Sequence, residues 1–111
     1  MPNRSKEKGN RFERYIVSLC EQADIPAKRS WGSNGMSLGL PEEVDVLIDS
    51  DIRVQAKVRK KIAEWLQPSG DVDLQVVKQD RGDVMVIMRF DDWLTDYRRL
   101  MEIEGRLEDN E

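Results

Sequence analysis

The stretch that decides the fold is VDVLIDSDIRVQAKV, residues 44–58. Aliphatic residues are concentrated in 44–48 and 52–58, and the polar triplet Asp49-Ser50-Asp51 separates the two runs. Runs of this composition on either side of a short polar break are typical of two antiparallel strands joined by a tight turn. The sequence therefore predicts a β-hairpin over residues 44–58.

A turn centred on Ser50 fixes which residues lie opposite each other in this hairpin. Counting outward from the turn, Asp45 lies opposite Gln55. Directly opposed residues have Cβ atoms about 4.5–5.5 Å apart, so both side chains can approach one ion. The two-residue period of a strand puts Gln55, Lys57 and Arg59 on one face and the apolar residues between them on the other. We expect a polar, functional face backed by an apolar one.

The residues before the hairpin predict a helix, a short strand and a loop. From about Lys8 to Ala23 the apolar residues recur at helical spacing, and Pro26 ends this helix. Residues 27–30 are expected to form a short strand. The following WGSNGMSLGLP, residues 31–41, holds three glycines and two serines, which predicts a mobile loop. Glu13 lies on the border of the apolar stripe, about 100° around the helix from Phe12, so it either projects toward the sheet or is a solvated carboxylate.

The residues after the hairpin predict two more strands and a last helix. A short helix or turn is expected over 61–66, and strands over 74–78 and 84–90, joined through 80–82. The last helix is expected to start near Asp91 or Asp92, whose carboxylate would cap it. The whole chain is expected to form one mixed α/β domain, residues 1–111, with a central mixed sheet of about four or five strands flanked by helices. Residues 1–7 are expected to be a flexible basic arm and residues 108–111 a flexible acidic tail.

Composition excludes several kinds of chemistry. The chain has no histidine, so Ser-His and Cys-His catalysis and His-ligated zinc are excluded. The single cysteine, Cys20, falls on the apolar side of the first helix, which favours a buried thiol over a nucleophile. No GxxxxGK[ST] motif is present, so we expect no nucleotide cofactor. Carboxylates, lysines and hydroxyl groups must carry any chemistry.

Charge is distributed unevenly along the chain. The net charge is −4 overall, but residues 1–61 hold 12 Lys and Arg against 9 Asp and Glu, a net of +3, and residues 62–111 hold 6 against 13, a net of −7. The amino-terminal half is therefore the half suited to phosphate contact. No apolar run approaches the roughly 20 residues that span a bilayer, and the start of the chain lacks the apolar segment of a secretion signal, so we expect a cytoplasmic protein without membrane contact.

The order of these residues resembles the PD-(D/E)xK nuclease superfamily and, within it, the small Holliday junction resolvases of archaea and related phage proteins. The resemblance covers about residues 6–61, and its matching stretches are KGNRFER (8–14), the Gly/Ser loop, EVDVL (43–47) and VQAK (54–57). It implies a restriction-endonuclease-like fold. It further implies a homodimer that uses Mg²⁺, with Mn²⁺ as a substitute, to nick DNA in pairs at four-way junctions, in a bacterial, archaeal or phage-infected cell.

The same resemblance implies roles for individual residues. Glu13, Asp45 and Gln55 would be catalytic residues that hold the metal ion, and Lys57 the catalytic lysine. By this resemblance Arg14, Arg29 and Ser33 would contact DNA or support the site. In addition, Arg11, Arg59 and Lys60 are expected to contact DNA. For Arg59 and Lys60 a solvated strand end is the alternative.

Two positions depart from the family pattern. Val44 replaces the usual proline before the first aspartate, and Gln55 replaces the usual Asp or Glu two residues before the lysine. An amide oxygen can still coordinate a hard cation, so Gln55 implies weaker metal binding, compensation by Glu42 or Glu43, or lost activity. The alternatives to a junction resolvase are a nuclease for linear, flapped or damaged DNA and a DNA-binding module without chemistry.

Overall fold

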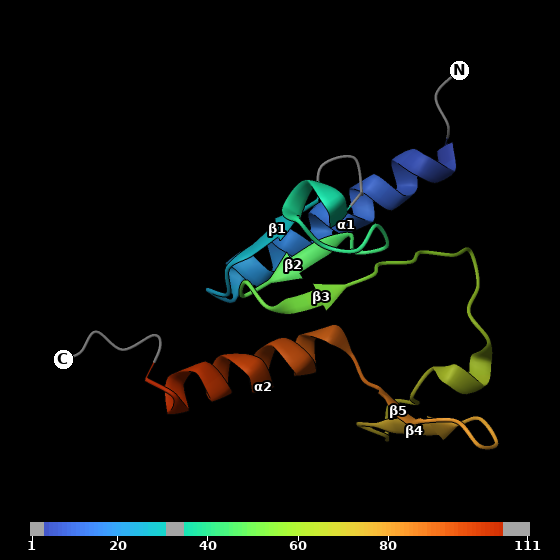
Figure 1. Ribbon diagram of the computed structural model, residues 1–111. Coiled ribbons are helices and arrows are strands. Elements are labelled where there is room, and N and C mark those ends of the chain that lie inside the picture. The colour runs from blue at the N-terminus through green and yellow to red at the C-terminus, as the bar shows by residue number, and fades with distance from the viewer. Residues whose placement is uncertain (1–3, 31–34, 106–111) are drawn as a thin grey trace. The chain divides into compact units, whose positions relative to one another are not determined.

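A computed structural model of the chain describes residues 4–30 and 35–105. The chain divides into two compact units, Met1–Val58 and Arg59–Glu111. Both contain a helix and a small antiparallel sheet (Figure 1). The protein is therefore mixed α/β, as predicted from its sequence.

The first unit consists of one long helix packed on a three-stranded sheet. Its elements are α1 (Arg4–Gln22), β1 (Ala27–Arg29), the 3₁₀ helix η2 (Gly35–Leu38), β2 (Val46–Ile48) and β3 (Ile52–Val54). The strands are antiparallel in the order β1-β2-β3, and α1 packs against β1 and β2 (Figure 1). The buried apolar residues Ile16 and Cys20 of α1 and Val46 and Ile48 of β2 form the core between the two layers. Burial raises the pKa of the Cys20 thiol to about 11, so this thiol is a core residue and not a nucleophile.

The carboxyl end of α1 shows why the chain turns back onto the sheet. Asp24 has a φ of 60°, its N–H donates to the Glu21 carbonyl at 3.0 Å, and the N–H of Ile25 donates to the Cys20 carbonyl at 2.8 Å. These two bonds around a left-handed residue are the Schellman motif that ends many helices. Ile25 is buried, and Pro26 follows it. The predicted helix end before Pro26 is confirmed.

The hairpin has the predicted register over the paired residues 46–48 and 52–54. The predicted opposition of Asp45 and Gln55 lies beyond these pairs, where the Asp45 N–H donates to the Val54 carbonyl. Val46 pairs with Val54 and Ile48 with Ile52 across β2 and β3. The strands are shorter than the predicted 44–48 and 52–58, because the N–H of Ala56 donates to the Asp45 side chain at 2.8 Å instead of to a carbonyl of the neighbouring strand. The exposure of the side chains nevertheless alternates along residues 52–58. The predicted polar face with an apolar back is thus present.

The turn of this hairpin is strained, and the strain can be relieved. Asp49 and Ser50 have φ values of 54° and 67°, as in type I′ turns, which favour glycine at the second of these positions. Ser50→Gly is expected to stabilise the unit by about 0.5–1 kcal/mol, because glycine adopts positive φ without a steric penalty. Thermal unfolding checks this, with Ser50→Ala as the control that keeps the Cβ atom and should bring no gain. An equal melting temperature for Ser50→Gly and wild type would contradict it.

The second unit contains a two-stranded sheet and the last helix. Its elements are the 3₁₀ helix η3 (Glu64–Leu66), β4 (Gln75–Lys78), β5 (Val84–Ile87) and α2 (Phe90–Ile103). The turn between the antiparallel strands is closed by a 2.8 Å bond from the Gly82 N–H to the Gln79 carbonyl. The Arg89 guanidinium donates to the carbonyls of Pro68, Ser69 and Val72 at 3.4, 2.6 and 3.1 Å. This one side chain therefore ties the loop before β4 to the start of α2.

Three expectations about these elements are corrected. The five strands form two sheets, of three and two strands, rather than the expected single central sheet of four or five. Helix α2 begins at Phe90 with Arg89 as its N-cap residue and no side-chain cap, so Asp91 and Asp92 lie in its first turn, where their charge suits the helix dipole. Residues 4–7, expected in a flexible arm, are the first turn of α1.

Some expectations fall beyond the described residues. These are the flexibility of residues 1–3 and 108–111 and the part of the Gly/Ser loop at 31–34. The rest of that loop contains the short 3₁₀ helix η2. Of the helices in the described part of the chain, none is both long enough and apolar enough to cross a bilayer.

Candidate active site

Glu13 lies on the buried side of α1 and is held by an arginine of the sheet. Its side chain is only 6% exposed. The Nη2 and Nε atoms of Arg29, in β1, donate to its Oε1 atom at 3.0 and 3.2 Å. Of the two readings of this residue, the solvated carboxylate is wrong, and the side chain that projects toward the sheet is confirmed.

Arg29 is held by a second residue of α1. Its Nη2 atom also donates to the Asn10 Oδ1 atom at 3.2 Å. Asn10 precedes Glu13 by three residues, which puts the two side chains on the same side of the helix. The guanidinium therefore fixes α1 on β1 and supports Glu13, and its contact with DNA stays a prediction.

Asp45 is fixed by both neighbouring strands. Its Oδ2 atom accepts the Ala56 N–H at 2.8 Å, and its own N–H donates to the Val54 carbonyl at 2.8 Å. On the other side, its carbonyl accepts the N–H and the hydroxyl of the buried Ser30 at 2.9 and 3.2 Å. Backbone and side chain are both held, so the half-buried carboxylate has a defined orientation.

The charges of two other predicted catalytic residues, Glu13 and Lys57, act on the pKa of Asp45. Burial raises the pKa of this carboxyl above its ordinary value, and the negative charge of Glu13 raises it further. The hydrogen bond from Ala56 and the charges of Lys57 and Arg29 act in the opposite direction. Asp45 thus lies within electrostatic range of Glu13, Lys57 and Arg29, which come from an α-helix and from two other strands or strand ends.

The two remaining members of the predicted set lie on the exposed face. Gln55 is exposed and lies between Val54 and Ala56, both of which bond to Asp45. Lys57 is also exposed. Within residues 4–30 and 35–105 no group of three or more His, Cys, Asp or Glu side chains is placed to hold a metal ion. The carboxylates of the site are therefore Glu13 and Asp45, and Gln55 would have to add an amide oxygen.

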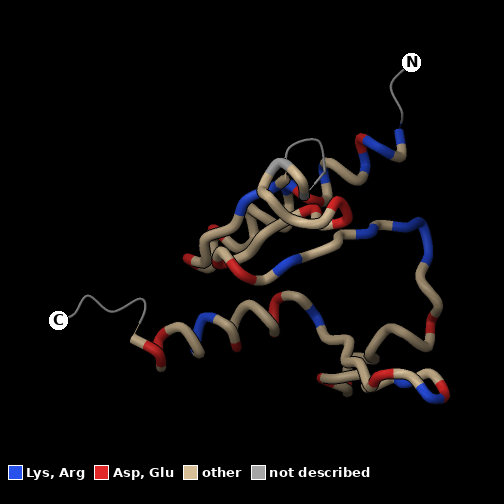
Figure 2. Tube along the Cα trace, viewed as in Figure 1, with Lys and Arg blue, Asp and Glu red and all other residues tan. Residues whose placement is uncertain are grey.

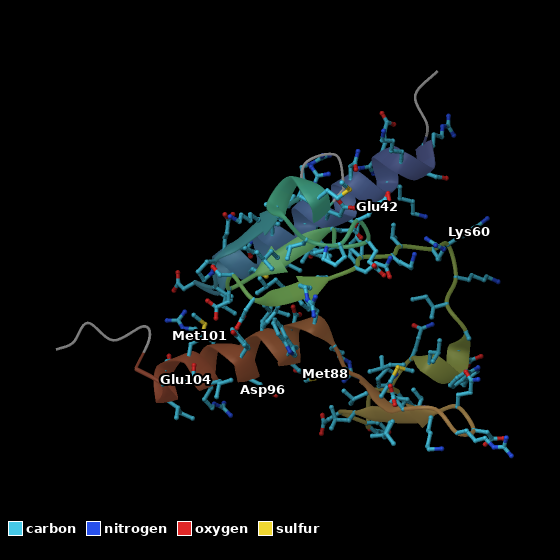
Figure 3. All side chains as sticks on the ribbon, viewed as in Figure 1. Glu42, Lys60, Met88, Asp96, Met101 and Glu104 are labelled. Atoms are coloured by element: carbon cyan, nitrogen blue, oxygen red, sulfur yellow. The ribbon has the colours of Figure 1, made fainter. Side chains whose placement is uncertain are left out.

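The residues predicted to contact DNA come from several parts of the chain. Arg11 and Arg14 are exposed on α1. Arg59 and Lys60 belong to the second unit, and Figure 3 shows the exposed Lys60 side chain pointing away from the ribbon. Ser33 lies outside the described residues. Glu42, labelled on the segment before β2 in Figure 3, and Glu43 are both exposed.

Two residues of the site received no role in the sequence analysis. Asn10 and Ser30 fix Arg29 and Asp45 through the bonds described above. The helical spacing of Asn10 and Glu13 was a usable signal for the first. The sequence held no signal for Ser30, because its contact with Asp45 depends on the pairing of β1 with β2.

The candidate site thus combines a buried carboxylate, a half-buried carboxylate, an exposed amide and an exposed ammonium group: Glu13, Asp45, Gln55 and Lys57. Hard oxygen ligands beside a cation are a donor set suited to Mg²⁺ and a phosphodiester. Comparison of the chain with protein family models, with curated proteins and with solved structures finds no match.

Proposed function

We propose that the protein is a metal-dependent DNA endonuclease with a restriction-endonuclease-like fold. Its substrate would be branched DNA, chiefly four-way junctions, and its active form a homodimer. The observation that carries the proposal is the electrostatic convergence on Asp45, where the charges of Glu13 and Lys57 both act on one oriented carboxylate. A nuclease of this kind needs oxygen ligands for a cation and a positive side chain for phosphate, and this cluster offers both.

The chemistry of the donor set fits Mg²⁺. Burial is the main cause of the raised pKa of Asp45, and the negative charge of Glu13 adds to it; a bound divalent cation would offset both effects. The two carboxylates and the amide oxygen of Gln55 would hold the ion. When bound, Mg²⁺ supplies Lewis-acid polarisation of the phosphate and lowers the pKa of bound water.

The side chains around the carboxylates have their own tasks. The Lys57 ammonium can stabilise negative charge that develops on the phosphate oxygens during hydrolysis. Arg29 neutralises and orients Glu13, and the Ala56 N–H orients Asp45. Such positioning matters because a displaced catalytic group loses much of the rate enhancement.

Gln55→Glu tests whether this position belongs to the metal site. A third carboxylate is expected to lower the melting temperature in EDTA, because it adds repulsion, and to tighten Mg²⁺ binding. Thermal unfolding with increasing Mg²⁺ measures both effects, and the stabilisation by Mg²⁺ should exceed that of wild type. Gln79→Glu, exposed in the second unit, is the matched control. Equal Mg²⁺ responses of the two variants would remove Gln55 from the site.

The function itself is tested with a labelled synthetic four-way junction and a linear duplex of matching sequence, each with Mg²⁺, Mn²⁺ or EDTA. Metal-dependent paired nicks in the junction alone support a resolvase. Cleavage of both substrates supports a nuclease for linear, flapped or damaged DNA. The absence of cleavage with either metal would contradict an endonuclease.

A second candidate function is DNA binding without chemistry. It is favoured by the ion pair between Glu13 and Arg29, which already neutralises one of the two carboxylates, and by the amide at Gln55. Binding of the junction with equal affinity in Mg²⁺ and EDTA, together with the absence of cleavage, would support this reading.

A further inference from the structure

The outward face of α1 carries a stripe of cations. Arg4, Lys8, Arg11 and Tyr15 follow the spacing i, i+4, i+7 and i+11, which places them within a sector of about 60° on a helix. All four are exposed, Tyr15 by 58%. Glu13, on the buried side of the same helix, lies about 180° from Arg4. We call these four residues the cationic stripe.

The stripe keeps an excess of positive charge. In the described part of the chain, Arg4, Lys8 and Arg11 form no ion pair. Figure 2 shows that the basic residues of α1 lie toward its amino-terminal end. Of the exposed acidic residues of this helix, Glu7 borders the stripe, three residues from Arg4 and four from Arg11, and Glu21 lies near the carboxyl end of the helix. A chain of net charge −4 therefore keeps a compact positive surface on one helix.

The dimensions of the stripe match a nucleic-acid backbone. From Arg4 to Arg11 the helix rises about 10 Å, at 1.5 Å per residue. One strand of B-DNA carries a phosphate about every 3.4 Å along the axis, so about three phosphates fall within that length. The Tyr15 hydroxyl, one turn further, is a donor of the kind that also bonds to phosphate oxygens.

We propose that the cationic stripe binds the phosphate backbone of duplex DNA, as a second contact on the face of α1 that points away from Glu13. The inference rests on the proposed function for the identity of the polyanion. A junction has several duplex arms. The stripe would bind an arm other than the one that is cleaved. Its contacts are with phosphates, so they supply affinity without sequence preference.

The chemistry of the stripe favours nucleic acid over a lipid surface. A helix that lies in a membrane interface needs a broad apolar face for the lipid. The apolar residues Ile16 and Cys20 of α1 are buried in the first unit, and Tyr15 is the one aromatic residue in the stripe. Stronger binding to vesicles of anionic lipid than to duplex DNA would overturn the assignment.

The test is duplex binding in EDTA, so that cleavage plays no part. The stripe variant Arg4→Gln/Lys8→Gln/Arg11→Gln is compared with Lys78→Gln/Arg81→Gln/Arg99→Gln, which removes the same charge from exposed positions of the second unit. Fluorescence anisotropy of a labelled duplex is recorded from about 50 to about 200 mM salt. Glutamine keeps the helix propensity of α1, which circular dichroism verifies.

The stripe variant is expected to bind at least about tenfold more weakly and to lower the slope of log K against log salt by about 2.7, which is 0.9 for each of three phosphates. The control variant should keep the slope of wild type. Equal losses in both variants would show a net-charge effect and overturn the proposal, as would an unchanged slope in the stripe variant. Tyr15→Phe should weaken binding severalfold without changing the slope. Because wild-type cleavage in Mg²⁺ is scored separately, a failed nuclease and a failed stripe give different results.

Discussion

Asp45→Asn is expected to abolish metal-dependent cleavage and at the same time to make the first unit more stable at neutral pH. In the proposed site this carboxylate is a ligand of the metal ion, so its loss should lower the cleavage rate by about a hundredfold to a thousandfold, the range seen when one transition-state contact is removed. Asparagine keeps an oxygen that can accept the Ala56 N–H, so the end of the hairpin is preserved. It removes the negative charge that burial and Glu13 disfavour.

The gain in stability has a defined pH dependence. Since the folded state raises the pKa of Asp45, the folded protein binds this proton more tightly than the unfolded chain. Below the ordinary Asp pKa of about 3.9, the ionisation of Asp45 therefore does not lower the free energy of unfolding. The loss of stability grows as the pH rises through the raised pKa. The difference between variant and wild type should be small at acid pH and reach its maximum above the raised pKa.

Thermal unfolding of wild type and Asp45→Asn across this pH range, in EDTA, measures the effect. Asp51→Asn, an exposed carboxylate in the same hairpin, is the control and should show little change. Mg²⁺ should stabilise wild type by mass action and leave Asp45→Asn unaffected. A variant that cleaves DNA as fast as wild type would end the assignment of Asp45, and one less stable than wild type at neutral pH would contradict the electrostatic account.

Arg29→Met is expected to destabilise the first unit by about 3 kcal/mol, because it removes the guanidinium that neutralises the buried Glu13 carboxylate. Methionine keeps much of the side-chain volume, so the loss is mainly electrostatic. Addition of Glu13→Gln should recover most of the stability, since the remaining group is then neutral. Urea unfolding of the four proteins of this double-mutant cycle measures the coupling between the two residues.

The matched control for this cycle is Arg53→Met, in β3 of the same sheet, where the arginine is exposed. Its cost should stay within about 0.5 kcal/mol, as is usual for surface positions. If Arg29→Met costs no more than Arg53→Met, the ion pair does not hold α1 on the sheet. Arg29 would then be available as a DNA contact, the other role that the sequence resemblance implies.

The local features of the first unit were predictable because they depend on neighbours in sequence. The Asp49-Ser50-Asp51 break determined the turn, and with it the pairing of Val46 with Val54. The position of Glu13 on the border of the apolar stripe was compatible with its burial, which the structure has. The features that depend on distant segments were not predictable, such as the bond of Ser30 to Asp45 and the separation of the five strands into two sheets. Hydrophobic periodicity specifies which residues of a strand are buried but not which strand lies beside it.

The Asp45 side chain has two roles. It accepts the Ala56 N–H at the end of the hairpin, and it is a metal ligand in the proposed chemistry. Any residue with a short side-chain acceptor can end the strand pairing there, whereas the proposed chemistry requires a carboxylate. Selection for folding alone would accept Asn at this position, and selection for cleavage would not. Under the proposed function, one substitution at this position would turn a nuclease into a DNA-binding protein with its architecture intact. In a set of related sequences, the residue at position 45 would distinguish nucleases from non-catalytic DNA-binding proteins better than overall sequence similarity does.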